Sequence, residues 1–367
     1  MIKNYLIISS LKKEISAEFQ TIMPNSVEAY KSFILGYKAY FKGDNLSAIK
    51  LFSQSLKIDS NFVYAYFWLS LSFANQGLFD QTEKWCLKVY GKREQLPFEL
   101  KIWANWIYAR YHEKSIYEEI KYAKQLLEIN DRIPLTHWTV GSAYYELHQY
   151  NNAIPELEKT LEIYKSWNTK PLNSNFYETL IIAYHETGRY KEEKELLKKA
   201  TEDFPDDLGL FRRQIILSFT EGDSVAANQN INKYISLSKD NSGSDIEITN
   251  NLAEIFYSAG ILDKAETNYR KALSMQPDNP VRLNNLAYFL IDKDRNPAEG
   301  LEIVDKALKL SPDNYLFIDT KGWGLFKSGN YEEALKLLKK SDSLKPIYNH
   351  GLDFHLQEVK KAIARQK

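Results

Sequence analysis

The chain has 367 residues, and its 48 lysines and arginines balance its 48 aspartates and glutamates. This charge balance gives no global electrostatic reason to bind nucleic acid or an anionic membrane, and we expect neither as a partner. The single cysteine, Cys86, excludes an internal disulfide and is expected to be a small buried apolar residue.

Residues 1–28 are expected to form an N-terminal helix and a lead-in to the rest of the chain. Their apolar run is short and is followed at once by Lys12 and Lys13, unlike the long apolar core of a secretory signal peptide. No stretch of the sequence is long enough to span a bilayer. We therefore expect a cytoplasmic protein with an amphipathic helix from Tyr5 to Phe19.

Residues 29–346 carry a pattern of small residues and glycines that returns about every 34 residues, nine times in succession. In the first repeat Gly36 lies mid-helix, Gly43 lies in a turn, and Ala48 lies on a second helix. Small residues allow two helices to pack closely. A glycine in the turn can end a helix because it adopts the left-handed backbone conformation without steric strain. The pattern predicts one helical hairpin per repeat, with later mid-helix positions at Ser70, Ile107, Gly141, Ile181, Ile215, Ala253, Ala287 and Gly322.

The third repeat departs from this pattern, because it lacks the turn glycine and has Glu119 where most repeats carry alanine. Insertions at residues 91–97, 165–174 and 238–245 are rich in turn formers and predict surface loops between repeats. After Pro346, residues 347–367 show a periodic apolar face and predict a C-terminal capping helix.

A search for catalytic or metal-binding motifs finds none. His185 is not followed by a second histidine four residues later, since Arg189 occupies that position, and His350 and His355 are five residues apart. No phosphate loop, dinucleotide fingerprint or nucleophile elbow is present. We expect no metal, no cofactor and no catalytic residues; an enzyme with an unrecognised site in its groove is the least favoured alternative.

The repeat spacing and its glycine, alanine, aromatic and proline positions resemble the tetratricopeptide repeat family. The resemblance implies an all-α fold: a right-handed superhelical solenoid of about nine helical hairpins, with an N-terminal helix and a C-terminal capping helix. It also implies a non-enzymatic scaffold for protein–protein interactions, which binds a peptide or protein segment in a concave groove lined by the first helix of each repeat.

Placed by this resemblance, the groove of the first four repeats is aromatic. A stripe of aromatic residues at helical spacing is often core, but Leu35, Leu69, Trp106 and Val140 are expected to fill the core positions. An aromatic groove suits the apolar anchors of a peptide, and the N-terminal helix of this chain is one possible occupant. The expected groove residues are Tyr30, Phe33, Tyr37, Tyr40, Tyr64, Phe67, Tyr108, Tyr111, Trp138 and Tyr145.

The groove of the later repeats is expected to carry asparagines. An asparagine side chain both donates and accepts hydrogen bonds, so a ladder of them can pair with the backbone of an extended peptide. The alternative is that they satisfy loop backbone groups. The positions are Asn250, Asn251, Asn284 and Asn285, with Asn105 in an earlier repeat.

The stretch from Asn25 to Ser70 is also similar to the start of the tetratricopeptide half of bacterial multidomain signalling proteins. That similarity implies an alternative function: a regulatory or sensory module that binds a small molecule or a signal peptide. An effector domain precedes the repeats in those proteins, whereas at most 24 residues precede them here, so we expect that domain to be missing or to have been removed from a longer chain. The partner's identity and the oligomeric state stay open.

Overall fold

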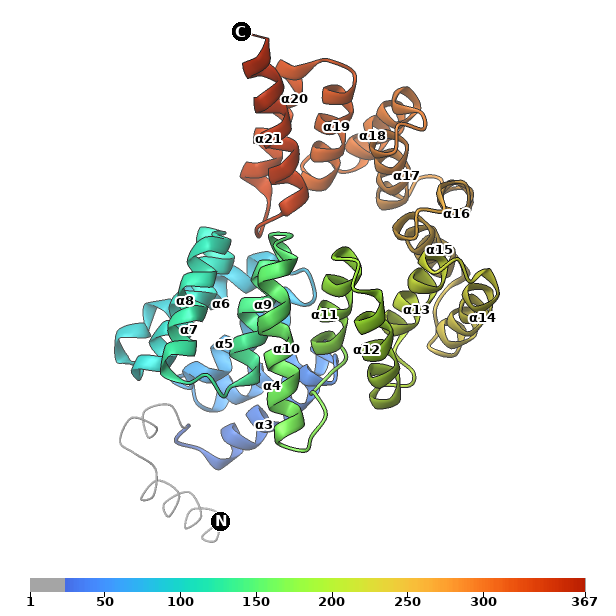
Figure 1. Cartoon of the computed structure of the whole chain (residues 1–367). Helices are drawn as coiled ribbons and strands as arrows, with labels where there is room; N and C mark the ends of the chain where they lie inside the picture. Colours follow the sequence, from blue (N-terminus) through green and yellow to red (C-terminus); the bar gives the residue numbers. More distant parts are fainter. Residues whose placement is uncertain (1–23, 367) are drawn as a thin grey trace. The chain divides into compact units, whose positions relative to one another are not determined.

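A computed structural model describes residues 24–366, and every regular element among them is helical (Figure 1). The helix expected between Tyr5 and Phe19 lies outside the described residues. The chain divides into two compact parts. Among the described residues, the N-terminal body comprises residues 24–180 and 346–348, and the C-terminal body comprises residues 181–345 and 349–366.

In the N-terminal body each expected repeat coincides with two consecutive helices. They are α3 (Val27–Phe41), α4 (Asn45–Ile58), α5 (Val63–Ala74), α6 (Phe79–Gly91), α7 (Phe98–Tyr108), α8 (Ile116–Ile129), α9 (Pro134–Glu146) and α10 (Tyr150–Ser166). The next helix, α11 (Asn175–Glu186), contains the division between the two bodies.

The C-terminal body continues the same alternation of first and second helices. It contains α12 (Tyr190–Asp203), α13 (Leu208–Thr220), α14 (Ser224–Asp240), α15 (Asp245–Ser258), α16 (Leu262–Met275), α17 (Pro280–Asp292), α18 (Pro297–Leu310), α19 (Tyr315–Lys327), α20 (Tyr331–Leu344) and α21 (His350–Arg365). The predicted all-α hairpin repeat is confirmed, while the domain boundaries at residues 28 and 346 stay predictions. The capping helix begins at His350 and buries Leu352, Leu356 and Val359 beside Leu338 of α20.

The small mid-helix residues lie where the two helices of a hairpin approach most closely. A Cβ atom at Gly141 would lie 2.7 Å from the side chain of Leu157, and one at Gly322 would lie 2.8 Å from Leu338. The turn glycines adopt positive φ angles, as at Gly43 with φ of 80°. Both features confirm the physical basis of the predicted hairpins.

The third repeat ends its first helix without a glycine. The α-helical turns of α7 pass into a π-helical turn, Ala109–Glu113, and Lys114 follows in the left-handed conformation with φ of 56°. The wider turn places Arg110 beside two carboxylates: its guanidinium donates to Glu119 at 2.7 and 2.8 Å and to Glu146 at 2.7 Å. This ion pair explains how Glu119, which is 3% exposed, occupies a position where most repeats carry alanine.

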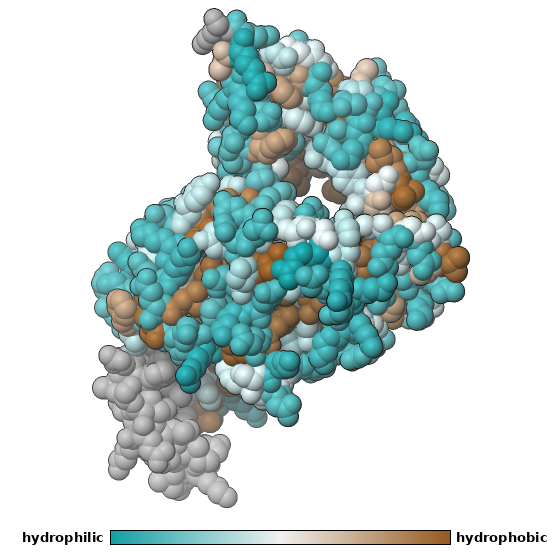
Figure 2. Space-filling view, viewed as in Figure 1, coloured by the Kyte–Doolittle hydropathy of each residue, from teal (hydrophilic) through white to brown (hydrophobic). Residues whose placement is uncertain are grey.

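One expectation about the core is wrong. Leu35 is 45% exposed, whereas Leu69, Trp106 and Val140 are buried as expected. On the face of the molecule seen in Figure 2, hydrophilic residues predominate and apolar residues form small separate patches. The regions expected to be loops contain the short 3₁₀ turn Arg93–Gln95 and the turns between α10 and α11 and between α14 and α15.

A candidate binding cavity in the N-terminal body

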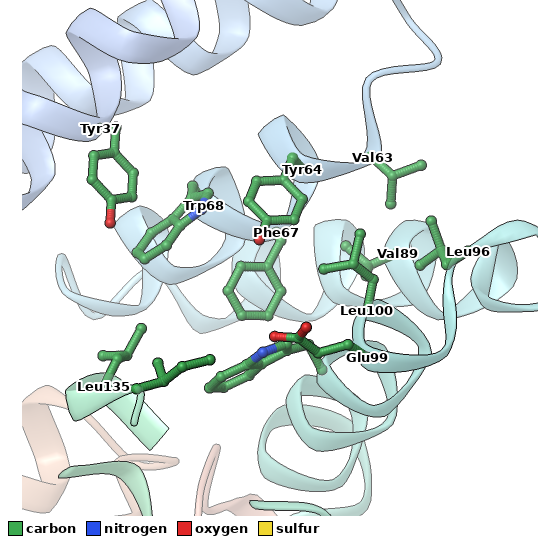
Figure 3. A pocket seen from close by; sticks show the side chains of 12 residues that line it. Tyr37, Val63, Tyr64, Phe67, Trp68, Val89, Leu96, Glu99, Leu100 and Leu135 are labelled. Atoms are coloured by element: carbon green, nitrogen blue, oxygen red, sulfur yellow. The ribbon is translucent and has the colours of Figure 1, made fainter. Parts of the chain in front are cut away.

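First helices of the N-terminal body surround a cavity of about 210 Å³ (Figure 3). Helices α3, α5 and α7 supply most of its lining. The rest comes from Val89 on α6, from Leu96 just before α7, and from Ile133 and Leu135 at the start of α9. Five lining side chains are aromatic, six are aliphatic, and one, Glu99, is charged. The aromatic residues are Tyr37, Tyr64, Phe67, Trp68 and Trp103.

The aromatic walls hold one another in place. Tyr64, Phe67 and Trp68 are spaced three and four residues apart on α5, so they project from one side of that helix. The ring of Trp68 meets that of Tyr37 edge-on at 4.9 Å between centroids, and Phe67 meets Trp103 edge-on at 5.9 Å. Such contacts stabilise the rings beyond their burial. The cavity is therefore formed before any ligand arrives.

A few polar groups interrupt the apolar lining. The carboxylate of Glu99 points inward from α7 in Figure 3, and it makes no hydrogen bond or ion pair with any residue between 24 and 366. Burial and the negative charge of Glu99 raise the pKa of Tyr64 to about 12, so its hydroxyl stays protonated. The indole N–H of Trp68 is buried and has no acceptor among the described residues.

Four of the predicted groove aromatics come together here. Tyr37, Tyr64 and Phe67 line the cavity, and Phe33 lies behind them at 6.3 Å from the ring of Tyr37 and 6.0 Å from that of Tyr64. Phe33 is only 6% exposed, so it supports the wall from inside the core. Tyr30 stacks on Phe33 at 6.5 Å.

The other predicted aromatics do not line the cavity. Each packs on a neighbouring ring or cation: Tyr40 on Trp68 at 5.0 Å, Tyr108 on Tyr90 at 3.7 Å, Tyr111 beside Arg110 at 5.7 Å, Trp138 on Phe176 at 5.3 Å, and Tyr145 on Tyr150 at 5.9 Å. Their role in binding stays a prediction.

Sequence reasoning did not single out Trp103 and Glu99, which α7 contributes to the cavity. The groove residues expected in the third repeat were Asn105, Tyr108 and Tyr111, and none of them lines the cavity. The available signal was the spacing of Glu99 and Trp103, which are four residues apart and so lie on one face of a helix.

Two of the predicted asparagines of the C-terminal body, Asn250 and Asn285, form hydrogen bonds with other side chains. The Nδ2 of Asn285 donates to Oδ1 of Asn250 at 3.1 Å, and the Nδ2 of Asn250 donates to Glu254 at 2.9 Å. These bonds reach other side chains, not the loop backbone that the alternative interpretation requires. Asn250 and Asn284 are buried, whereas Asn251, Asn285 and the earlier Asn105 are half-buried.

Among residues 24–366, no three histidine, cysteine, aspartate or glutamate side chains are grouped so as to hold a metal ion. Cys86 is buried as expected; its thiol donates to the carbonyl of Ile107 at 3.3 Å, and burial raises its pKa to about 12. Searching the same residues for a helix that is long and apolar enough to span a bilayer yields no candidate.

Comparison with known proteins points to one family. The tetratricopeptide repeat model matches residues 246–279, which contain α15 and α16. A TPR repeat-containing protein of Pseudomonas aeruginosa is 32% identical over 97 residues, or 26% of this chain and 16% of the relative. One of Methanocaldococcus jannaschii is 39% identical over 89 residues, or 24% of this chain and 16% of the relative. The matches thus span a small part of each relative's length.

A solved structure shows the same fold at low sequence identity. The crystal structure of the APC/C hetero-tetramer Cut9–Hcn1 superposes with a TM-score of 0.51 at 15% identity, covering 84% of this chain and 58% of that one. Three observations indicate the same repeating helical hairpin. They are the succession of paired helices, the close packing at the small residues, and the family match at residues 246–279. The chain therefore contains a tetratricopeptide repeat at residues 246–279, and the other hairpins repeat the same pairing of helices.

Proposed function

We propose that this chain binds a peptide segment of a protein partner through the cavity on α3, α5 and α7. The tetratricopeptide fold supports a protein-interaction scaffold in general, because stacked hairpins present long surfaces to partners. The observation that carries the proposal is the preformed cavity with five aromatic side chains in its wall. Aromatic pockets of this kind hold the few side chains that contribute most of the affinity at protein interfaces.

The size of the cavity favours a peptide over a larger free ligand. Pockets that enclose drug-sized molecules have volumes of roughly 300–1,000 Å³. At about 210 Å³ this cavity suits one or two side chains of a partner whose remaining contacts lie outside it. The half-buried Asn251 and Asn285 of the C-terminal body are a second proposed contact surface. A cytoplasmic location and the absence of a nucleic-acid partner are parts of the same proposal.

The alternative is a regulatory module that responds to a small molecule or a signal peptide. The same cavity is the place where a small ligand would bind, so one set of variants tests both functions. Peptide binding that depends on the cavity supports the scaffold, and binding of metabolites without peptides supports the sensor.

A displayed peptide library selected on the full chain tests the proposal. The dissociation constant of an enriched peptide is then measured by calorimetry for the natural chain, for Tyr64→Ala and for Phe98→Ala. Tyr64 lines the cavity, whereas Phe98 is 71% exposed on α7 and does not, so it is a matched control.

We expect Tyr64→Ala to weaken binding at least about tenfold, as the loss of an interface anchor does, and Phe98→Ala to change it less than about twofold. Circular dichroism checks that both variants remain helical. Failure to enrich any peptide, or equal affinities for both variants, would overturn the proposal.

A further inference from the structure

We infer that the cavity on α3, α5 and α7 takes a basic side chain, lysine or arginine, from the peptide partner. The inference rests on the proposed function and specifies the chemistry of the anchor. It is carried by two features of the same cavity: a wall rich in aromatic rings, and a single carboxylate, Glu99, that no described residue neutralises.

The rings supply the first half of the recognition. Aromatic faces carry partial negative charge, and a cation held close to the centre of such a ring is attracted to it. Tyr37, Tyr64, Phe67 and Trp103 are half-buried and line the cavity, so each keeps part of its ring accessible. Their mutual contacts fix the rings in position, which reduces the entropy lost when a ligand binds.

Glu99 supplies the second half. Among the described residues it is the only charged one in the lining, and a half-buried carboxylate among apolar neighbours gains more from a cation than an exposed one does. An acidic anchor would be repelled by the same carboxylate, and a neutral one would leave it unpaired. Charge complementarity therefore selects a basic occupant.

The basic residues near this end of α7 are already engaged elsewhere. Lys101 pairs with Glu94, and Arg93 lies over the ring of Tyr90 at 3.8 Å. Lys92 donates to the side chain of Asn61 at 3.0 Å. Within the described residues, these neighbouring cations satisfy other groups and leave the Glu99 carboxylate to the ligand.

The aliphatic side chains complete the fit. Leu100 and Leu135 line the cavity together with the rings. The methylene stem of a lysine or arginine packs on apolar surface while its charged end seeks a polar partner. The stem would lie against the leucines and the rings, and the charged end would reach Glu99.

Two small probes test this charge preference on the full chain. They are Nα-acetyl-lysine N-methylamide and Nα-acetyl-norleucine N-methylamide. The two side chains have the same four-carbon chain, and only the lysine probe carries a terminal ammonium group. Their dissociation constants are measured by NMR titration for the natural chain, for Glu99→Gln and for Glu128→Gln. Glu128 is exposed on α8 and does not line the cavity, so its substitution makes the same change in net charge without touching the site.

We expect the lysine probe to bind the natural chain at least fivefold more tightly than the norleucine probe. Glu99→Gln should remove that difference, and Glu128→Gln should preserve it. Equal or tighter binding of norleucine, or a lysine preference that survives Glu99→Gln, would overturn the inference. Peptides that bind through Tyr64 but show no charge preference would leave the proposed function standing while the inference fails.

Discussion

Buried glutamates mark two repeats in which the second helix departs from the usual alanine. Glu119 and Glu193 are 3% and 0% exposed. Each has a partner near the end of the first helix of its hairpin: Arg110 at 2.7 Å from Glu119, and His185 at 2.9 Å from Glu193. A buried carboxylate without such a partner costs several kcal/mol, so the paired cation is what allows the glutamate to stay in the core.

The ion pairs of Arg110 with Glu119 and Glu146 lead to a prediction about the free energy of unfolding. Burial raises the pKa of Glu119, the Arg110 guanidinium opposes this, and the Glu146 carboxylate adds to the rise. Replacing Arg110 by methionine leaves two carboxylates together without their cation and should reduce the free energy of unfolding by about 3 kcal/mol.

The double variant Arg110→Met with Glu119→Ala should recover most of that loss, because it restores the alanine found in other repeats. Urea unfolding of the single and double variants measures the coupling. A double variant as unstable as Arg110→Met alone would contradict the account.

From the contact between His185 and Glu193 we predict that the free energy of unfolding depends on pH. The hydrogen bond to Glu193 raises the pKa of His185 above its ordinary value, although burial acts in the opposite direction. A raised pKa in the folded state means that the protonated form stabilises the fold. This contribution is fully present below the unfolded pKa of about 6.5 and is lost as the pH rises through the folded value.

The free energy of unfolding of the natural chain should therefore exceed that of His185→Gln by more at pH 5.5 than at pH 9. Chemical denaturation at both pH values provides the measurement. A difference that stays constant with pH would mean that the ion pair with Glu193 contributes nothing to the stability.

Within the hairpins, some glycines lie where two helices touch and others have open space around them. Substitution by alanine distinguishes the two kinds. A Cβ at Gly141 would meet Leu157 at 2.7 Å, whereas one at Gly91, at the end of α6, would meet no atom within 4 Å. Neither residue has a positive φ angle. Gly141→Ala should cost about 1–3 kcal/mol through overpacking.

Gly91→Ala is the matched control, and it should be neutral or stabilise by up to about 1 kcal/mol because alanine is the better helix former. Thermal unfolding of the two variants compares them. Equal stability of both would show that the hairpins tolerate a wider separation than the contacts at Gly141 indicate.

The hairpins were predictable because their signals are local. Gly43 and the other turn glycines mark turns by their own backbone preference, and Gly141 marks a close approach by its lack of a side chain. The third repeat gave no such signal, since Lys114 adopts the left-handed conformation after a π-helical turn. Leu35 was misplaced because its periodicity fits the helix but does not tell which face is covered.

The candidate site was only partly predictable. Tyr37, Tyr64 and Phe67 follow from their place in the repeat, but Trp103 and Glu99 join them because α7 packs beside α5 and α6 in a repeat with an irregular end. The asparagine pairs were recognised by their recurrence. Their bonds to each other and to Glu254 depend on the distances between neighbouring helices, which spacing along the chain does not give.

For the whole molecule, the repeat pattern predicts the succession of helices but not the division of the chain into two bodies inside α11. No residue type in the repeat pattern marks that division. In repeat proteins each hairpin is stabilised by itself and by its immediate neighbours, so a local defect weakens the region around it first.

A substitution at Leu157 tests whether a defect in one hairpin destabilises only the hairpins near it. Leu157 is fully buried on α10, and replacing it by alanine should cost about 2–5 kcal/mol through lost contacts and a residual cavity. Native-state hydrogen exchange followed by mass spectrometry should then show faster exchange of amides in α9 and α10, while α17 to α19 in the C-terminal body keep their protection. Uniformly faster exchange through both bodies would instead mean that the chain unfolds as one cooperative unit, and that stability is shared across the division in α11.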